Sequence, residues 1–125
     1  MNYILFNYGE TPEYIKYTLN SIKSVDPYSN IHFLSDRKNN FRNVNNLIFS
    51  DFPSLNEKRD FLIDYYKDTP YSKDKYPLFF TSVLRIYALY EISNKLKIES
   101  FIHFDNDVLI YKSFDELNKN DLFIK

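Results

Sequence analysis

The segment FFTSVLRIYALYEISNKLKIESFIHFDND, residues 79–107, contains a helical pattern, an apolar strand pattern and two aspartates in direct succession. In its first part apolar residues recur every three or four positions, which predicts an amphipathic helix over 78–96. The apolar run at 101–104 is typical of a short buried strand. A helix that leads into a buried strand is the repeating unit of α/β domains, so this segment predicts the fold class.

The rest of the chain repeats this alternation of short apolar strands and amphipathic helices. Strands are expected at 3–8, 31–34 and 47–49, helices over 54–67 and from about Thr11-Pro12-Glu13 to Val25, and, near the end of the chain, a helical turn at 114–119 and a strand at 121–124. The resulting order, β-α-β-β-α-α-β, predicts a Rossmann-like α/β domain with a mainly parallel sheet and flanking helices, formed by residues 1–125 as one unit.

The spacing of apolar residues also predicts which face each helix buries. For 78–96 the expected stripe is Phe79, Val83, Ile86 and Tyr90, widened by Phe80, Leu84 and Tyr87. For 54–67 it is Leu55, Phe61, Leu62 and Tyr65, and for the first helix it is Tyr14, Ile15, Leu19, Ile22 and Val25.

Composition excludes several classes of function. The chain has 125 residues, a net charge of −1 and no excess of basic residues, which argues against nucleic-acid binding. It has no cysteine, so thiolate metal sites and cysteine nucleophiles are excluded. No window is long and apolar enough for a transmembrane segment, and no signal peptide is recognisable, so a cytoplasmic protein is expected. Gly9 is the only glycine, which excludes the glycine-rich loops that hold phosphates in many nucleotide sites.

Polar residues follow three of the predicted strands. Asn7, Tyr8 and Gly9 follow the first strand, Asp36 follows the second, and Asp105 opens the aspartate pair after the last. In parallel α/β sheets, ligands bind beyond the carboxyl ends of the strands. We therefore expect one crevice at this edge of the sheet.

The aspartates at 105 and 107 present an electrostatic problem. Two carboxylates at positions i and i+2 of an extended chain project to the same side and repel each other. No lysine or arginine lies within four residues of either; the nearest basic residue is Lys112. A hard divalent cation with oxygen ligands would relieve this repulsion.

Two kinds of metal site fit the pattern poorly. In an EF-hand calcium loop the pair would take the first and third positions, but Ile110 stands where the glycine is required. Phosphatases of the haloacid dehalogenase type also place Asp-x-Asp after an apolar strand, but continue with Gly-Thr where this chain has Val108-Leu109. The phosphatase remains a weak alternative.

The segment 79–117 resembles the central part of family 8 glycosyltransferases of the GT-A fold, and of proteins described as sugar-binding regions containing a DXD motif. The matching elements, in order, are Thr81 or Ser82, Arg85, the strand 101–104, Asp105 and Asp107, Val108-Leu109, and the turn Phe114-Asp115-Glu116-Leu117. The resemblance covers about a third of the chain. In that family a further metal ligand, often histidine, and the acceptor-binding half follow; no histidine follows Asp107 here.

The resemblance implies a glycosyltransferase that binds a nucleotide diphosphate sugar, most simply a UDP-sugar, with Mn²⁺ or Mg²⁺. It implies that Asp107 ligates the metal, that Asp105 binds the metal or the ribose, and that Arg85 points to the phosphates or the sugar. Asn7 or Tyr8 would contact the base, Gly9 would line the same crevice, and Asp36 would contact the base or ribose.

A second hypothesis is a non-catalytic nucleotide- or sugar-binding module. It would hold the donor, while another chain, an oligomeric partner or a region after Lys125 would bring the acceptor, a sugar, glycan or protein that the motifs leave undefined.

Overall fold

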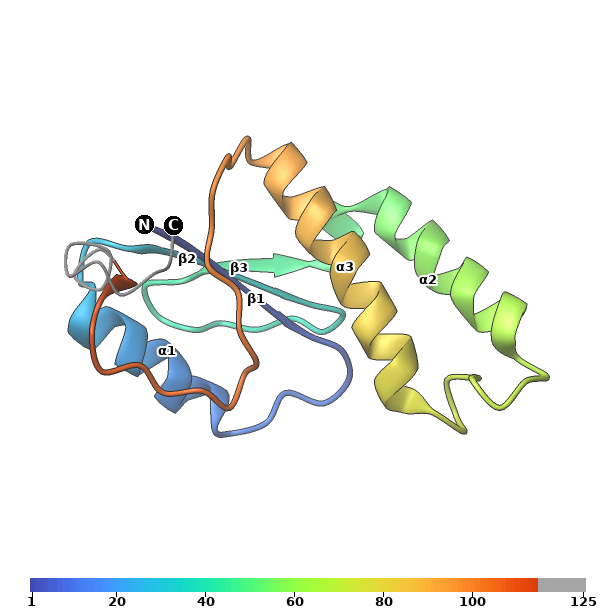
Figure 1. Cartoon of the computed structure of the whole chain (residues 1–125). Helices are drawn as coiled ribbons and strands as arrows, with labels where there is room; N and C mark the ends of the chain where they lie inside the picture. Colours follow the sequence, from blue (N-terminus) through green and yellow to red (C-terminus); the bar gives the residue numbers. More distant parts are fainter. Residues whose placement is uncertain (115–125) are drawn as a thin grey trace, which may run out of the picture.

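In the computed structural model, which describes residues 1–114, three parallel strands form a sheet with helices on both faces (Figure 1). The elements in chain order are β1 (Asn2–Asn7), α1 (Ile15–Val25), β2 (Asn30–Ser35), β3 (Asn45–Ile48), the short 3₁₀ helix η1 (Phe49–Asp51), α2 (Pro53–Tyr66) and α3 (Pro77–Lys95). The predicted mixed α/β class with a parallel sheet is confirmed. The predicted turn at 114–119 and strand at 121–124 lie outside the described residues, apart from Phe114.

Strand β2 lies in the middle of the three-stranded sheet. It pairs with β1 in parallel from Asn2↔Asn30 to Asn7↔Ser35, and with β3 from His32↔Asn45 to Ser35↔Ile48. All three strands therefore end at the same edge of the sheet. The third strand begins at Asn45, two residues earlier than predicted, and ends where η1 begins.

The predicted strand 101–104 is reduced to a single parallel bridge between Ile102 and Tyr3, on the edge of β1 that faces away from β2. Ile4 donates its N–H to the Ile102 carbonyl and Ile102 donates to the Asn2 carbonyl, both at 2.9 Å. Further along this edge of β1, side chains bond to the backbone carbonyls that a longer paired strand would use. His103 bonds to the Ile4 carbonyl at 2.7 Å, and Asn106 donates its amide to the Phe6 carbonyl at 2.8 Å. Polar side chains therefore take the place of a fourth regular strand.

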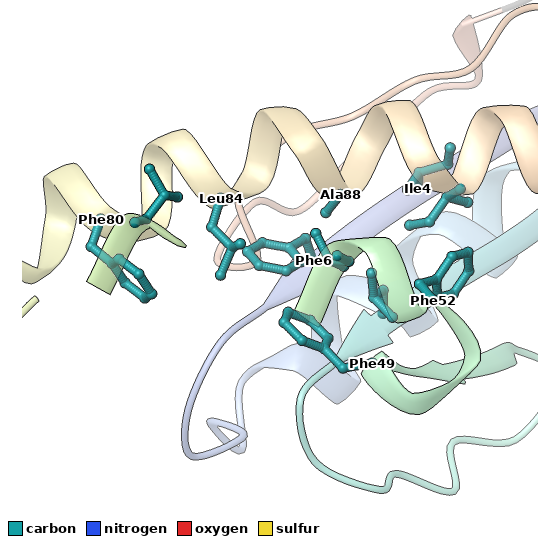
Figure 2. Packing of buried hydrophobic residues seen from close by; sticks show 11 residues of the cluster. Ile4, Phe6, Phe49, Phe52, Phe80, Leu84 and Ala88 are labelled. Carbon is teal, nitrogen blue, oxygen red and sulfur yellow. The ribbon is translucent and has the colours of Figure 1, made fainter. Parts of the chain in front are cut away.

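Alternate residues of the strands supply two hydrophobic clusters, one on each face of the sheet. The first, between the sheet, α2 and α3, consists of Ile4, Phe6, Leu34, Phe49, Phe52, Leu55, Leu62, Phe80, Leu84, Ala88 and Ile92 (Figure 2). The second, between the sheet and α1, consists of Tyr3, Leu5, Ile15, Leu19, Ile22, Ile31 and Phe33. Ile102, Phe104, Ile110 and Phe114 of the last described segment pack against the second cluster.

The predicted buried stripes need the largest correction in two helices. Helix α3 buries Phe80, Leu84, Ala88 and Ile92, whereas Ile86 and Tyr90 are 68% and 59% exposed. This helix is apolar on most of its circumference, so its periodicity did not select a face. The face with Ala88 is the one that packs on the sheet (Figure 2).

Helix α2 shows the same kind of difference. It buries Leu55 and Leu62 as predicted, but Phe61 and Tyr65 are exposed and stack on each other, with ring centroids 5.6 Å apart. Because α2 packs chiefly on α3 at the side of the molecule, only a narrow stripe of its surface is covered (Figure 1).

Helix α1 begins at Ile15, later than the predicted start at 11–13. It buries Ile15, Leu19 and Ile22 as expected, leaves Tyr14 about half exposed, and buries Thr18 to 1% exposure. Of the helices within residues 1–114, none combines the length and apolar character that crossing a bilayer requires.

Candidate functional site at the carboxyl edge of the sheet

The chain reversals after β1 and β2 are joined by a hydrogen bond. Gly9 donates its N–H to Oδ1 of Asp36 at 2.8 Å, and Asn7 donates its side-chain amide to the carbonyls of Gly9 and Glu10. Gly9 has a φ of 96°, a backbone conformation that side chains disfavour, which accounts for glycine at this position. The structure therefore brings Asn7, Gly9 and Asp36 together at one edge.

The aspartate pair lies in a turn beside the end of β1, and we call residues 105–110 the aspartate turn. Val108 donates its N–H to the Asp105 carbonyl at 3.3 Å, which closes the turn. Asn106, between the two aspartates, donates its amide to the Phe6 carbonyl at 2.8 Å and to Oδ1 of Asn7 at 3.4 Å. Asn106 thus connects the aspartate turn to the polar residues that follow β1.

Arg85 supplies the positive charge that is missing near the aspartates in the sequence. Its guanidinium donates from Nη1 to Oδ1 of Asp105 at 2.9 Å, across 20 positions of the chain. The Arg85 side chain is 33% exposed and that of Asp105 is 66% exposed, so the pair remains accessible to a ligand. Asp107 is exposed and has no hydrogen bond or ion pair within residues 1–114.

A pocket of about 460 Å³ opens at the same edge, a volume in the range of small-molecule sites. Its lining residues come from the ends of β1 and β2, the α2–α3 connection and the first turns of α3: Tyr8, Gly9, Asp36, Arg37, Lys73, Asp74, Pro77, Phe80 and Thr81. Two aromatic rings belong to this lining, with the Tyr8 ring edge-to-face on Phe80 and the ring centroids 5.3 Å apart. Nζ of Lys73 lies 5.8 Å from the centre of the Tyr8 ring.

The predicted residues thus fall into two groups on one edge. Tyr8, Gly9 and Asp36 line the pocket, whereas Arg85 and Asp105 form their ion pair outside its lining. Thr81 lines the pocket one helical turn before Arg85 on α3. Residues four apart lie on one side of a helix, so α3 runs from the pocket toward the ion pair.

Sequence reasoning missed Arg37, Lys73 and Asn106. The basic residues lie in polar loops with no periodic pattern, and only the tertiary fold brings them to the pocket. Asn106 carried a usable signal, because an amide between two carboxylates can donate where the aspartates cannot.

His103 lies two residues before Asp105. The structure half buries it, with Nδ1 hydrogen-bonded to the Ile4 carbonyl. Burial lowers the pKa of His103 below its usual value of 6.5, and the nearby Arg85 charge adds to this, against the effects of the Ile4 hydrogen bond and Asp105. A neutral ring that donates from Nδ1 leaves Nε2 as a buried acceptor, which has no partner among the described residues.

A larger hollow, about 570 Å³, lies at the opposite edge, near the amino ends of β1 and β2. Its only histidine, His32, already has both ring nitrogens hydrogen-bonded, Nε2 to Asn2 and Nδ1 to Asn45. Burial lowers the pKa of His32, which favours the neutral ring that these two bonds accommodate. The ion pair between Arg85 and Asp105, in contrast, lies at the carboxyl edge.

At the carboxyl edge of the sheet, the aspartate turn offers oxygen donors to a cation. Within residues 1–114, no three side chains of His, Asp or Glu gather into a metal-binding group. The two aspartates would therefore provide two carboxylates and leave the remaining ligands to water or to a bound anion.

Comparison of the chain with protein-family models, with curated proteins and with solved structures finds no match.

Proposed function

We propose that the chain binds a nucleotide diphosphate sugar at the carboxyl edge of the sheet and acts as a metal-dependent glycosyltransferase domain of the GT-A type. The Arg85–Asp105 ion pair carries this proposal. It unites the helix arginine and the Asp-x-Asp motif, two of the elements by which residues 79–117 resemble family 8 transferases.

The course of the chain supports this choice of edge. From β1 the chain passes to β2 on one side, and it later returns to bridge β1 on the other side through Ile102. In Rossmann-like sheets, the gap between two strands reached in opposite directions is where ligands bind, beyond the carboxyl ends. Gly9 and the aspartate turn lie at this gap.

The pocket suits the nucleoside part of such a donor. The Tyr8 and Phe80 rings offer apolar surface to a base, and Asp36 has a second carboxylate oxygen for a ribose hydroxyl or a base N–H. The diphosphate would extend along α3 to Arg85, whose guanidinium suits phosphate oxygens. The same binding orients the sugar carbon that is to be attacked.

Mn²⁺ or Mg²⁺ fits the donor set of the aspartate turn. Asp107 is exposed and has no partner among residues 1–114, and Asp105 shares one oxygen with Arg85. Hard divalent cations prefer such carboxylate oxygens. When bound, the ion would act as a Lewis acid on the diphosphate leaving group. Arg85 would add a fixed positive charge at the same phosphates.

Thermal unfolding tests the proposal directly. At about 100 times the dissociation constant, UDP with Mn²⁺ should add about 2.7 kcal/mol to the free energy of unfolding. Either ligand alone should add much less, because two carboxylates leave a cation incompletely coordinated. The proposal fails if UDP binds equally well with and without metal.

A second assay separates a transferase from a binding module. Release of UDP from UDP-sugars is measured with Mn²⁺, with and without mixed sugar acceptors. Turnover that requires metal and is lost in Arg85→Ala supports the enzyme. Metal-linked binding without any turnover supports the non-catalytic module.

A further inference from the structure

Helix α1 holds the aspartate turn through two hydroxyl groups. Thr18, 1% exposed, donates its hydroxyl to the Asn106 carbonyl at 2.5 Å. Ser21, three residues later on the same side of the helix, accepts the N–H of Ile110 at 3.2 Å and donates to the Thr18 carbonyl at 2.7 Å. The backbone of the turn is therefore bound to α1 on both sides of Asp107.

The Asn106 side chain holds the turn from the other direction, through the Phe6 carbonyl at the end of β1. The residue between the aspartates is thus bonded to α1 by its carbonyl and to β1 by its amide. The Asp105 and Asp107 carboxylates, in contrast, remain exposed. This is a fixed backbone that presents two exposed carboxylates, of which that of Asp105 is paired with Arg85.

We infer that Thr18 and Asn106 are positioning residues for the two carboxylates, and that Ser21 supports them. The inference rests on the proposed function, since it states how the metal-binding carboxylates are kept in place. Two like charges in one short turn repel each other, and a turn without these bonds would let them separate. Coordination of a cation by two carboxylates requires them close together, so the hydroxyl contacts should set metal-dependent affinity rather than nucleotide affinity.

The test uses pairs of substitutions that separate the hydroxyl from the packing. Thr18→Val keeps the shape of the buried side chain and removes the hydroxyl, whereas Thr18→Ser keeps the hydroxyl. Ser21→Ala is matched by Ser93→Ala, because Ser93 makes the same bond to the carbonyl three residues earlier in α3 and does not touch the turn. Ile92→Val serves as a control for destabilisation alone, since Ile92 is buried at the far end of α3.

The first readout is the factor by which Mn²⁺ tightens UDP binding, measured by titration calorimetry. We expect about tenfold or more for the wild type, within the usual range of coupling between two ligands. Thr18→Val should lose most of this factor and keep the metal-free affinity for UDP. The full factor should be retained in Thr18→Ser, Ser93→Ala and Ile92→Val. For Ser21→Ala we expect a factor between those of the wild type and Thr18→Val. The inference is overturned if Mn²⁺ tightens UDP binding by the same factor in Thr18→Val as in the wild type. It is also overturned if Ile92→Val loses as much of this factor as Thr18→Val does.

The second readout does not depend on any ligand. Amide hydrogen exchange of Val108, whose N–H closes the turn, should become about tenfold faster in Thr18→Val relative to amides of β1, and should be unchanged in Thr18→Ser. If the amides of the turn change no more than those of β1, Thr18 does not hold the turn. If exchange responds as expected while the wild type shows no metal coupling, Thr18 holds the turn, the proposed function fails, and with it the inferred metal role.

Discussion

The two faces of the sheet are covered in different ways. On one face α2 and α3 cover the first hydrophobic cluster, and every buried member of that cluster belongs to a strand or a helix, except Phe52, which directly precedes α2. On the other face α1 covers only part of the second cluster. The irregular segment 101–114 completes it with partly buried side chains. Regular helices therefore close one face, whereas α1 and a loop that carries the aspartate turn close the other.

The difference shows how this small domain separates stability from function. A loop leaves backbone and side-chain groups available, so His103 and Asn106 bond to β1 while the aspartates stay exposed. A fourth regular strand would have used the same carbonyls for its own ladder. The first cluster, built from regular elements, should then dominate the free energy of unfolding, whereas the aspartate turn on the second face should contribute to metal-dependent ligand binding with little effect on stability.

The largest expected effect comes from the first cluster. Leu84→Ala removes a fully buried side chain from the face of α3 that packs on the sheet, and should lower the free energy of unfolding by about 2–5 kcal/mol. Leu78→Ala, on the same helix but 65% exposed, should cost much less. Urea unfolding followed by circular dichroism measures both. Equal losses would show that α3 does not pack as described.

A change on the second face should affect ligand binding and leave the unliganded protein intact. Asp107→Asn keeps the shape and removes a charge with no partner among the described residues, so unliganded stability should stay within about 0.5 kcal/mol. It should remove most of the stabilisation of about 2.7 kcal/mol given by UDP and Mn²⁺. Asp68→Asn, at another exposed aspartate, is the matched control in the same melting experiment. Full ligand stabilisation of Asp107→Asn would contradict the metal role.

The Arg85–Asp105 pair should contribute little to folding. Both side chains are partly exposed, and such pairs typically contribute about 0.2–1 kcal/mol. A double-mutant cycle with Arg85→Ala and Asp105→Asn measures this coupling energy in unliganded protein. Arg85→Ala should nevertheless weaken UDP binding in the absence of metal. A coupling energy well above this range would make the pair a structural element.

The smallest expected effect is the pH dependence contributed by His32, on the edge opposite the site. Burial lowers its folded-state pKa below 6.5, so the unfolded chain binds more protons as the pH falls below that value. Stability should therefore be complete above pH 6.5 and decline below it. His32→Gln should flatten this decline without abolishing it, because the pKa of His103 is lowered as well. Melting temperatures across this range provide the measurement, and an unchanged slope in His32→Gln would contradict the assignment.

Much of the fold was predictable because it depends on local patterns. The strands at 3–8 and 31–34 and the helices over 54–67 and 78–96 follow from apolar runs and periodicity, and the structure has them within two residues. The buried faces of α2 and α3 were less predictable, since both helices carry more apolar and aromatic residues than one interface can cover. The fourth strand was predicted from its apolar residues. In the structure, side chains bond to the β1 carbonyls that this strand would have paired with, and an apolar pattern does not reveal such competition.

The sequence by itself determined the alternation of strands and helices, the absence of glycine-rich phosphate loops and the place of two aspartates after an apolar run. These properties are local, because they depend on the type and spacing of neighbouring residues. Only the tertiary structure decided which positive charge pairs with the aspartates and which residues hold the aspartate turn in place. Arg85, 20 positions away, approaches Asp105 because α3 packs on the sheet, and Thr18 reaches Asn106 because α1 packs on the opposite face. Hydrogen bonds and ion pairs act through distances in space, and the packing of the two hydrophobic clusters sets those distances.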